Sequence, residues 1–375
     1  MRAHVAATAA MLVLAACGSA GPEPAADLPK LDITTLADGL DHPWDVAVAP
    51  DGTILTGERS GRFVALRPGV TEPQPIDADL SDLFARGETG LMGLAFAADF
   101  DTSRELFSCQ GYTHGVQQDV RVVTWRVSTD WQRLERTGVL ISGLPSRTGR
   151  HGGCRLILED SDTLLIGTGD SAQPKVSQDP NSLGGKVLRV DSRTGAPAEG
   201  NPLPNSLVFT LGHRNIQGLA VQPKTGTIYT AEHGPDVDDE VNRIVPGGNY
   251  GWKPDRSGDW YDESVPMTDP DRVPGAIPAV WSSGASTIAI CALTFLGTEW
   301  GNWSGAIAVA ALKGQQIRLL KLSTDGKSVT AVTQLPELNG TYGRIRTVQS
   351  QPDGSLLVTT DNGGDDQILR VRPVS

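Results

Sequence analysis

The sequence predicts an all-β fold, a six-bladed β-propeller with four-stranded blades, on three observations. Glycine and proline are abundant, with 43 and 25 among 375 residues, and no long segment shows the periodicity of a surface helix. A unit of apolar strand, polar turn and second apolar strand recurs six times. A further apolar strand follows most of these units, so each stretch of roughly 50–70 residues can form one blade.

The six repeated units have the pattern of β-hairpins. Each has β-branched or leucine-rich flanks around a turn rich in Asp, Gly, Pro or Thr. The hairpins are expected at 45–58, 93–109, 155–170, 218–234, 292–312 and 347–363. The strands that follow them are expected at 62–68, 120–127, 186–192, 317–323 and 368–374.

The segment LDITTLA, residues 31–37, has the pattern of a strand but no hairpin partner nearby. It can supply the missing outer strand of the last blade and so close the ring. A large β-sandwich or two β domains are the alternatives, although no change in composition marks a boundary. One propeller domain is therefore expected over residues 30–375. Long insertions at 171–185, 196–210 and 234–280 should form loops that carry function.

The N-terminus predicts export and a lipid anchor. An apolar run of about a dozen residues is too short to cross a bilayer, but it suits a signal peptide over residues 1–16. The sequence LAAC at 14–17 resembles the lipobox of bacterial lipoproteins, which implies cleavage before Cys17 and lipidation of its sulfur. Residues 17–29 would then be the lipidated cysteine and a flexible tether. We expect an exported protein attached to the bacterial cell membrane or envelope; an ordinary signal peptide with an unrelated cysteine is the alternative.

Charge and cysteine content narrow the possible partners. The net charge is −12 and no basic cluster appears, which argues against a nucleic acid partner. Besides Cys17 the chain has Cys109, Cys154 and Cys291, with no CxxC motif. Outside the cytoplasm one disulfide is expected, with Cys109–Cys154 as the favoured pair, and three buried free thiols are the alternative.

Polar side chains occur at corresponding ends of several predicted strands. They are His151, Arg155 and Asp170 around the third hairpin, Arg214 and Asn215 before the fourth, Lys313 within the turn after the fifth, and Arg344 and Arg346 before the sixth. Because the innermost strands of a propeller line a central channel, these side chains should gather at one mouth. A basic pocket there would suit an anionic ligand.

One short loop, TAEHGPDVDDEVN at 230–242, is crowded with acidic residues. Its five carboxylates belong to Glu232, Asp236, Asp238, Asp239 and Glu240. Like charges repel at such spacing, so the loop is either well solvated or holds a cation. The residues alone leave both interpretations open.

Eight segments occur in an order typical of one family. They are HPWDVAVAPDG (42–52), GETGLMGLAF (87–96), HGGCR (151–155), QDPNSLGGKVLRVD (178–191), LGHRNIQGLAVQPKTG (211–226), EHGPDVDDEVN (232–242), NYGW (249–252) and RIRTV (344–348). The chain thereby resembles the soluble quinoprotein glucose dehydrogenases and bacterial aldose sugar dehydrogenases over about 320 residues. The resemblance implies a six-bladed propeller that binds pyrroloquinoline quinone (PQQ) and calcium. It also implies oxidation of an aldose at its anomeric carbon to the lactone, with electrons passed to an acceptor that the sequence does not identify.

The resemblance also implies roles for individual residues. His151 would be the general base, Asp170 would hold or stabilise it, and Arg214 would stabilise negative charge on the quinone. Further contacts to PQQ would come from Asn215, Lys313, Arg344 and Arg346, and an aromatic wall for the sugar from Trp281. The backbone carbonyl groups of Gly234 and Pro235 would bind the calcium beside PQQ. The Glu240 carboxylate and the Tyr250 backbone carbonyl would bind a second, structural calcium.

Two departures from the family pattern bear on cofactor binding. Glu88 occupies a position where the family usually has a Gln that contacts PQQ, and Cys154 replaces a Gly. A carboxylate is unfavourable beside an anionic cofactor unless it is paired or protonated. The leading hypothesis is a PQQ- and calcium-dependent sugar dehydrogenase. The alternatives are a cofactor-free propeller that acts as a cell-envelope binding or scaffold protein, and a calcium-dependent hydrolase or lactonase.

Overall fold

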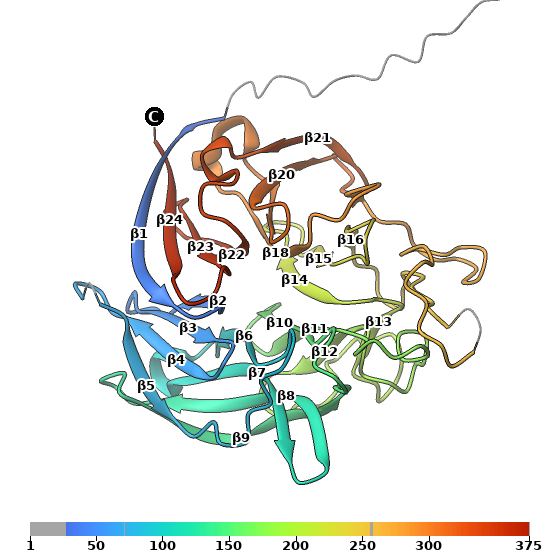
Figure 1. The fold of residues 1–375 in the computed structure, drawn as a ribbon, viewed down its shortest axis with the longest axis horizontal. Helices are drawn as coiled ribbons and strands as arrows, with labels where there is room; N and C mark the ends of the chain where they lie inside the picture. Colours follow the sequence, from blue (N-terminus) through green and yellow to red (C-terminus); the bar gives the residue numbers. More distant parts are fainter. Residues whose placement is uncertain (1–27, 71, 256–257, 375) are drawn as a thin grey trace, which may run out of the picture.

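Six antiparallel blades arranged around a common centre form the fold (Figure 1). The computed structural model describes residues 28–70, 72–255 and 258–374. Each blade has four strands, and five of the six blades use consecutive strands of the chain. The predicted six-bladed, all-β propeller is therefore confirmed, and the predicted signal peptide and Cys17 lie outside the described residues. No helix in the described part of the chain is long and apolar enough to span a membrane.

The strands of each blade follow the chain from the centre outward. Blade 1 consists of β2 (Pro43–Val48), β3 (Ile54–Glu58), β4 (Arg62–Leu66) and β5 (Gln74–Ala78). Blade 2 consists of β6 (Leu91–Phe96), β7 (Glu105–His114), β8 (Gln117–Val127) and β9 (Arg133–Leu144), with the short helix α1 (Phe100–Ser103) between β6 and β7. Blade 3 consists of β10 (Gly153–Leu158), β11 (Thr163–Thr168), β12 (Lys186–Asp191) and β13 (Val208–Leu211).

The second half of the ring repeats this arrangement. Blade 4 consists of β14 (Ile216–Val221), β15 (Ile228–Glu232), β16 (Glu240–Arg243) and β17 (Trp281–Ser282). Blade 5 consists of β18 (Ile290–Phe295), β19 (Ile307–Ala311), β20 (Gln316–Leu322) and β21 (Val329–Gln334), with the 3-10 helices η1 (Thr298–Trp303) and η2 (Pro336–Leu338) nearby. Blade 6 consists of β22 (Ile345–Ser350), β23 (Leu356–Thr360), β24 (Asp366–Val374) and, from the other end of the chain, β1 (Lys30–Leu40).

The ring is closed by the N-terminal strand, as predicted. β1 pairs antiparallel with β24, so that Lys30 lies opposite Val374 and Leu40 opposite Asp366. The innermost strand β22 also packs against β2 of the first blade. β24 is thereby paired along both of its edges, and β1 is the outermost strand of the last blade.

The turns explain why the hairpins form where the sequence predicts them. In the first hairpin the Asp51 carboxylate accepts the backbone N–H of Thr53 at 2.9 Å, and Gly52 adopts a φ of +83°. In the last hairpin Asp353 and Gly354 repeat this arrangement, with a φ of +78° at the glycine. Asp caps the turn and Gly supplies the left-handed conformation, so the PDG sequence fixes the register of both hairpins.

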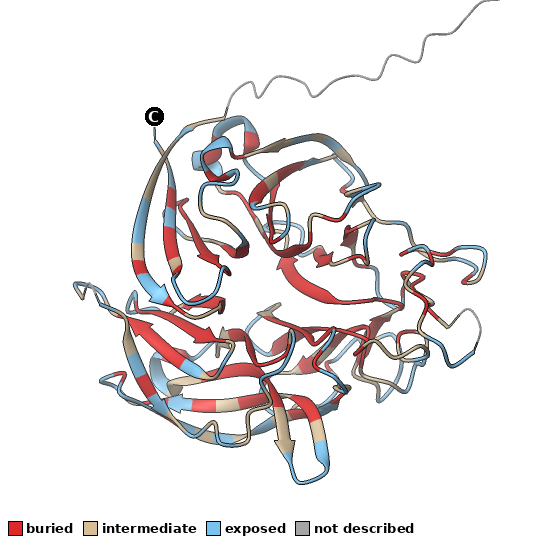
Figure 2. Ribbon diagram, viewed as in Figure 1, coloured by how far each residue is buried: buried red, intermediate tan, exposed pale blue. Residues whose placement is uncertain are grey.

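Close packing between the buried inner strands holds neighbouring blades together (Figure 2). At Gly218 in β14 a Cβ atom would lie 2.2 Å from the carbonyl oxygen of Cys291 in β18, so only glycine fits. Between blades 2 and 3 the favoured pairing is confirmed, because a disulfide joins Cys109 in β7 to Cys154 in β10. Cys291 is the remaining described cysteine, and it is buried.

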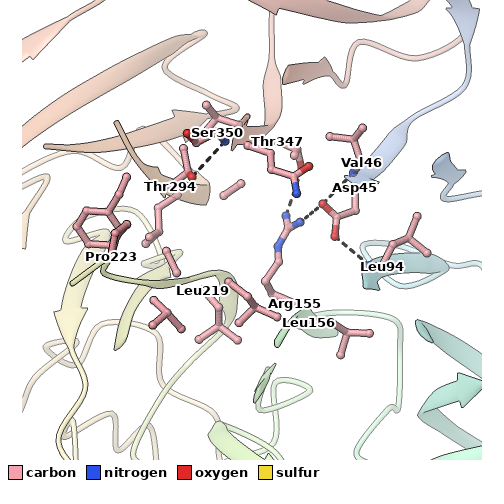
Figure 3. Close-up of a pocket in the computed structure, with 18 residues that line it drawn as sticks. Asp45, Val46, Leu94, Arg155, Leu156, Leu219, Pro223, Thr294, Thr347 and Ser350 are labelled. Carbon is pink, nitrogen blue, oxygen red and sulfur yellow. Dashed lines mark hydrogen bonds and ion pairs between the residues drawn. The ribbon is translucent and has the colours of Figure 1, made fainter. Parts of the chain in front are cut away.

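Arg155 reaches into the space between the inner strands (Figure 3). Its buried guanidinium forms an ion pair with Asp45 of β2 and donates to the carbonyl oxygen of Gln217 at 2.8 Å and the Thr347 hydroxyl at 3.3 Å. These contacts tie blades 1, 3, 4 and 6 to one side chain. Arg155 also lines a cavity of about 220 Å³, whose other walls are mainly apolar residues of the inner strands. Arg155 therefore has a structural role between this cavity and the opposite mouth.

Candidate active site

A polar cavity of about 300 Å³ lies at the mouth where the inner strands begin. It is lined by Glu88, Arg150, His151, Arg214, Asn215, His233, Pro235, Asp236 and Glu263. Five residues nominated from the sequence are thus brought together: Glu88, His151, Arg214, Asn215 and Pro235. They come from loops before β6, β10 and β14 and after β15, which the chain places far apart.

His151 is held in one orientation by the buried carboxylate of Asp170. The Nδ1 atom of His151 lies 2.8 Å from Oδ1 of Asp170. The carboxylate also accepts hydrogen bonds, each at 2.8 Å, from the Ala172 backbone N–H, the Trp252 indole and the Tyr261 hydroxyl. A carboxylate facing Nδ1 favours the tautomer with its proton on that atom. Nε2 of His151 is then free to accept a proton.

The local backbone around His151 is unusual and tightly supported. His151 has a φ of +47°, a conformation that costs a non-glycine residue on the order of 1–3 kcal/mol. Its carbonyl oxygen approaches Gly169 so closely that a Cβ atom there would lie 1.9 Å away. Asp170 donates its own N–H to the carbonyl oxygen of Arg214 at 2.9 Å. These contacts between blades 3 and 4 fix the positions of His151, Asp170 and Arg214 relative to one another.

Three residues beside the base were not predicted from the sequence. Trp252 and Tyr261 contact Asp170, and Glu263 reaches the cavity from the same insertion at 234–280. Burial, and then the neighbouring Asp170, raise the pKa of Tyr261, so its hydroxyl remains a hydrogen-bond donor. The NYGW segment marked Trp252 without giving it a role, and only the length of the insertion signalled Tyr261 and Glu263.

The carboxylate of Glu88 lies in the cavity and is hydrogen-bonded, and no arginine of the described residues contacts it directly. It accepts from the Asn215 amide at 2.9 Å and from the Gln217 amide at 3.4 Å. Burial alone would raise the pKa of Glu88, but His151, His233, Asn215 and Arg214 together lower it. Glu88 is therefore an ionised neighbour of Asn215, one of the residues nominated to bind a cofactor.

Arg214 spans the cavity between two acceptors. Its Nη1 donates to the carbonyl oxygen of His233 at 2.7 Å, and its Nη2 donates to Glu263 at 2.6 Å. The Nε atom is buried and has no hydrogen-bond partner within the described structure. One donor of this guanidinium is thus still available to a ligand.

The other nominated cations do not line the described cavity. Arg346 is buried, donates to Asp361 at 3.0 Å and to the Gln217 side-chain oxygen at 2.8 Å, and so reaches Glu88 only through Gln217. Arg344 and Lys313 are exposed at the same end of blades 6 and 5. The sequence placed them at the correct face, but it could not show how far each side chain lies from the channel.

The predicted aromatic wall at Trp281 is not where the sequence suggested. Trp281 lies in β17, the outermost strand of blade 4, and packs with Arg318, whose guanidinium carbon is 5.9 Å from the ring centre. It does not line the cavity. Its place in an outer strand keeps it from the centre, and Tyr261 is the aromatic residue beside His151, with ring centres 6.0 Å apart.

The cavity is also less basic than expected. Glu88, Asp236 and Glu263 oppose the two guanidinium groups of Arg150 and Arg214. The carboxylates of Glu88 and Glu263 already accept hydrogen bonds from protein groups, so they do not form the open carboxylate cage that a calcium-dependent lactonase would need.

The acidic loop brings one of its nominated residues to the wall of the cavity. Pro235 lines the cavity, and the Gly234 carbonyl oxygen lies 2.5 Å from Nδ1 of His233. Asp239 points away, since its carboxylate accepts the Gly234 N–H at 2.9 Å and the Thr287 hydroxyl at 2.7 Å. The Asp239 carboxylate is therefore hydrogen-bonded by protein groups, and the loop places Pro235 at the cavity.

Glu240 and the carbonyl of Tyr250 meet a short distance away. The Thr268 hydroxyl lies 3.1 Å from Oε1 of Glu240 and 3.2 Å from the Tyr250 oxygen. Burial, with the nearby charge of Glu232, raises the pKa of Glu240 to about 8. A buried carboxylate, a backbone carbonyl and a hydroxyl form an oxygen-only set, which fits a hard cation. The donor chemistry here agrees with a structural calcium site.

Comparisons with known proteins show the family of this chain. The family model for glucose/sorbosone dehydrogenases matches residues 40–370. An aldose sugar dehydrogenase of Escherichia coli is 29% identical over 354 residues, which cover 92% of this chain and 93% of that protein. An uncharacterized protein of Synechocystis is 32% identical over 372 residues, which cover 92% of this chain and 87% of the relative.

The fold is also similar to that of a solved aldose sugar dehydrogenase. The PQQ-bound form of the aldose sugar dehydrogenase of Streptomyces coelicolor superposes with a TM-score of 0.76 at 29% identity. The match covers 92% of this chain and 99% of that one. The chain therefore belongs to the glucose/sorbosone dehydrogenase family of oxidoreductases, and its predicted relationship to the PQQ-dependent sugar dehydrogenases is confirmed.

Proposed function

We propose that this oxidoreductase carries out the PQQ- and calcium-dependent oxidation of an aldose at its anomeric carbon, giving the lactone. The observation that carries the proposal is the His151–Asp170 pair, whose hydrogen bond of 2.8 Å leaves Nε2 of His151 as a base at the cavity. Relatives that are aldose sugar dehydrogenases, one of them solved with PQQ, support the choice of substrate and cofactor.

The donor set of the cavity fits these two groups. Among the described residues the buried Nε of Arg214 has no partner, and the Asn215 amide donates one of its two N–H groups to Glu88. Nε of Arg214 and the second N–H of Asn215 would therefore hold an anionic quinone. Backbone oxygens of Gly234 and Pro235 would hold the calcium of the active site, and Glu240 with Tyr250 the structural one. When bound, PQQ would supply the hydride acceptor and its calcium would supply Lewis acidity.

The chain's own residues perform the proton chemistry. Nε2 of His151 would take the proton of the anomeric hydroxyl. The Asp170 carboxylate keeps Nδ1 protonated and stabilises the imidazolium that results. Trp252 and Tyr261 hold that carboxylate in place with two hydrogen bonds of 2.8 Å. The guanidinium of Arg214 adds positive charge where the reaction develops negative charge.

We also propose where the enzyme is located. The lipobox-like LAAC sequence and the tether at 17–29 support an exported protein anchored to the cell membrane through Cys17. The electron acceptor would then be another component of the cell envelope. The test is whether the full-length protein incorporates a labelled fatty acid and a Cys17→Ser variant does not.

Cofactor binding is tested by titrating the mature protein with PQQ in the presence of calcium while following the quinone absorbance. Saturable binding, weakened by Arg214→Ala, is expected. Because Glu88 places a negative charge beside Asn215, Glu88→Gln should tighten binding. An absence of binding at tens of micromolar PQQ by both wild type and the Glu88→Gln variant would contradict the proposal and leave the cofactor-free propeller.

A further inference from the structure

Glu263 occupies the cavity without any role in the chemistry described above. Its carboxylate accepts from Nη2 of Arg214 at 2.6 Å and is bound through both oxygens by Arg150 at 2.9 and 3.0 Å. The side chain is 35% exposed, so one side of the carboxylate still faces the cavity. A substrate in the cavity would meet this group directly.

The position of Glu263 relative to the base is well defined. Its Oε1 lies 3.9 Å from Nε2 of His151, the nitrogen that accepts the substrate proton. Two residues earlier, Tyr261 is anchored to Asp170 at 2.8 Å. The same segment thus contacts the base from two sides, and a sugar whose hydroxyl reaches Nε2 also lies beside the Glu263 carboxylate.

The charge of Glu263 decides which ligands the two arginines can receive. Burial would raise the pKa of Glu263, but Arg150 and Arg214 outweigh it and lower the pKa, so the group is anionic. Without this carboxylate, two adjacent guanidinium groups would form a site for carboxylates or phosphates. With it, one Nη group of each guanidinium is occupied, whereas Nε of Arg214 still has no partner among the described residues. Glu88 and Asp236 add negative charge around the cavity.

We propose that Glu263 is a specificity-determining residue, which admits uncharged sugars to His151 and rejects sugars that carry a carboxylate or phosphate group. The inference rests on the proposed sugar oxidation. The physical basis is repulsion between like charges in a partly buried site, together with occupation of the two arginines by an internal carboxylate. Uncharged hydroxyl groups meet no such penalty, and they can donate to the exposed side of the carboxylate.

The test compares glucose with glucuronate as substrates, using a dye acceptor and the holoenzyme. The variants are Glu263→Gln, which removes the charge at nearly constant shape, and Glu263→Asp, which keeps the charge. Glu105→Gln is the matched control, because Glu105 forms a comparable arginine pair at 2.9 Å on the surface. In wild type, Glu263→Asp and Glu105→Gln, the kcat/KM for glucuronate should be at least about tenfold below that for glucose. In Glu263→Gln the ratio of kcat/KM for glucose to kcat/KM for glucuronate should fall by about tenfold or more.

A binding measurement separates this inference from the proposed oxidation. Glucuronate binding to each variant is followed by saturation-transfer NMR, which needs no turnover. Glu263→Gln should gain a signal that 0.5 M NaCl suppresses, because its freed arginines bind the anion electrostatically. If no variant oxidises any sugar, the proposed function is wrong. The presence or absence of a glucuronate binding signal in Glu263→Gln then still tests whether Glu263 excludes anions. An unchanged glucuronate signal and an unchanged substrate ratio in Glu263→Gln would overturn the inference.

Discussion

Replacing Asp170 by Asn tests whether this carboxylate sets the state of the catalytic base. In the native protein each oxygen of Asp170 accepts two hydrogen bonds, from His151 and Ala172 on one side and from Trp252 and Tyr261 on the other. An amide keeps only one accepting oxygen. In either orientation it leaves one buried N–H unpaired, which costs about 1–3 kcal/mol of stability.

The catalytic cost should be larger than the loss of stability. When His151 accepts a proton, it lies 2.8 Å from a full negative charge in the native protein. At an effective dielectric constant of about 20 this attraction is worth at most about 6 kcal/mol, and a neutral amide loses most of it. The amide also permits the tautomer in which Nε2 already carries a proton. We therefore expect kcat to fall by about 10²- to 10⁴-fold, or about 3–5 kcal/mol.

The assay is sugar-dependent dye reduction by the holoenzyme, with urea unfolding measured in parallel. Asp366→Asn is the matched control. Asp366 is equally buried and also accepts four hydrogen bonds, but it lies at the β1–β24 junction. It should lose similar stability and keep kcat within about threefold of wild type. A folded Asp170→Asn protein with kcat within tenfold of wild type would refute the role of the carboxylate.

Three further predictions concern stability and metal binding. Lys186→Met removes the donor that now lies 2.6–2.9 Å from the carbonyl oxygens of Val176, Ser177 and Gly184, and among the described residues only that of Ser177 keeps a second donor, the Gly212 N–H. The change should cost about 3 kcal/mol, measured as a lower urea midpoint at an unchanged m value. Burial alone would raise the pKa of Asp361, but Arg346 and His42 hold the pKa below its ordinary value of 3.8. Asp361 therefore contributes fully to the free energy of unfolding above pH 3.8, and this contribution is lost as the pH falls through the lower pKa of the folded state. Asp361→Asn should therefore make the free energy of unfolding fall less steeply as the pH is lowered. An unchanged pH dependence would count against this role of Asp361. Chelation of calcium should lower the melting temperature of wild type, whereas Glu240→Gln should melt lower from the start and respond little to chelator; equal responses would exclude Glu240 as a ligand.

The fold could be predicted from the sequence because its signals are local. The PDG turns at 50–52 and 352–354 set the hairpins, and the alternation of strand and turn sets the number of blades. The unpaired strand at 31–37 was informative for the same reason, since a propeller that lacks one outer strand must take it from elsewhere. Its pairing with β24 confirms that argument.

The candidate site could be predicted only in part, because side-chain reach is not a local property. His151, Arg214 and Asn215 start inner strands, so their convergence follows from the topology. Tyr261 and Glu263 come from a loop whose path depends on tertiary contacts, and no periodicity reveals it. Lys313 and Arg344 were nominated from their places at strand ends and Trp281 from the family resemblance. Both arguments fix a position along the chain but not the distance of the side chain from the cavity.

The most direct test of the account is turnover by the mature protein reconstituted with PQQ and calcium, with an aldose as substrate and a dye as electron acceptor. Dye reduction that depends on sugar, PQQ and calcium together, and that falls by at least about 10²-fold in His151→Ala while PQQ still binds, is the predicted result. No sugar-dependent dye reduction by PQQ-saturated protein, or turnover unaffected by His151→Ala, would contradict it.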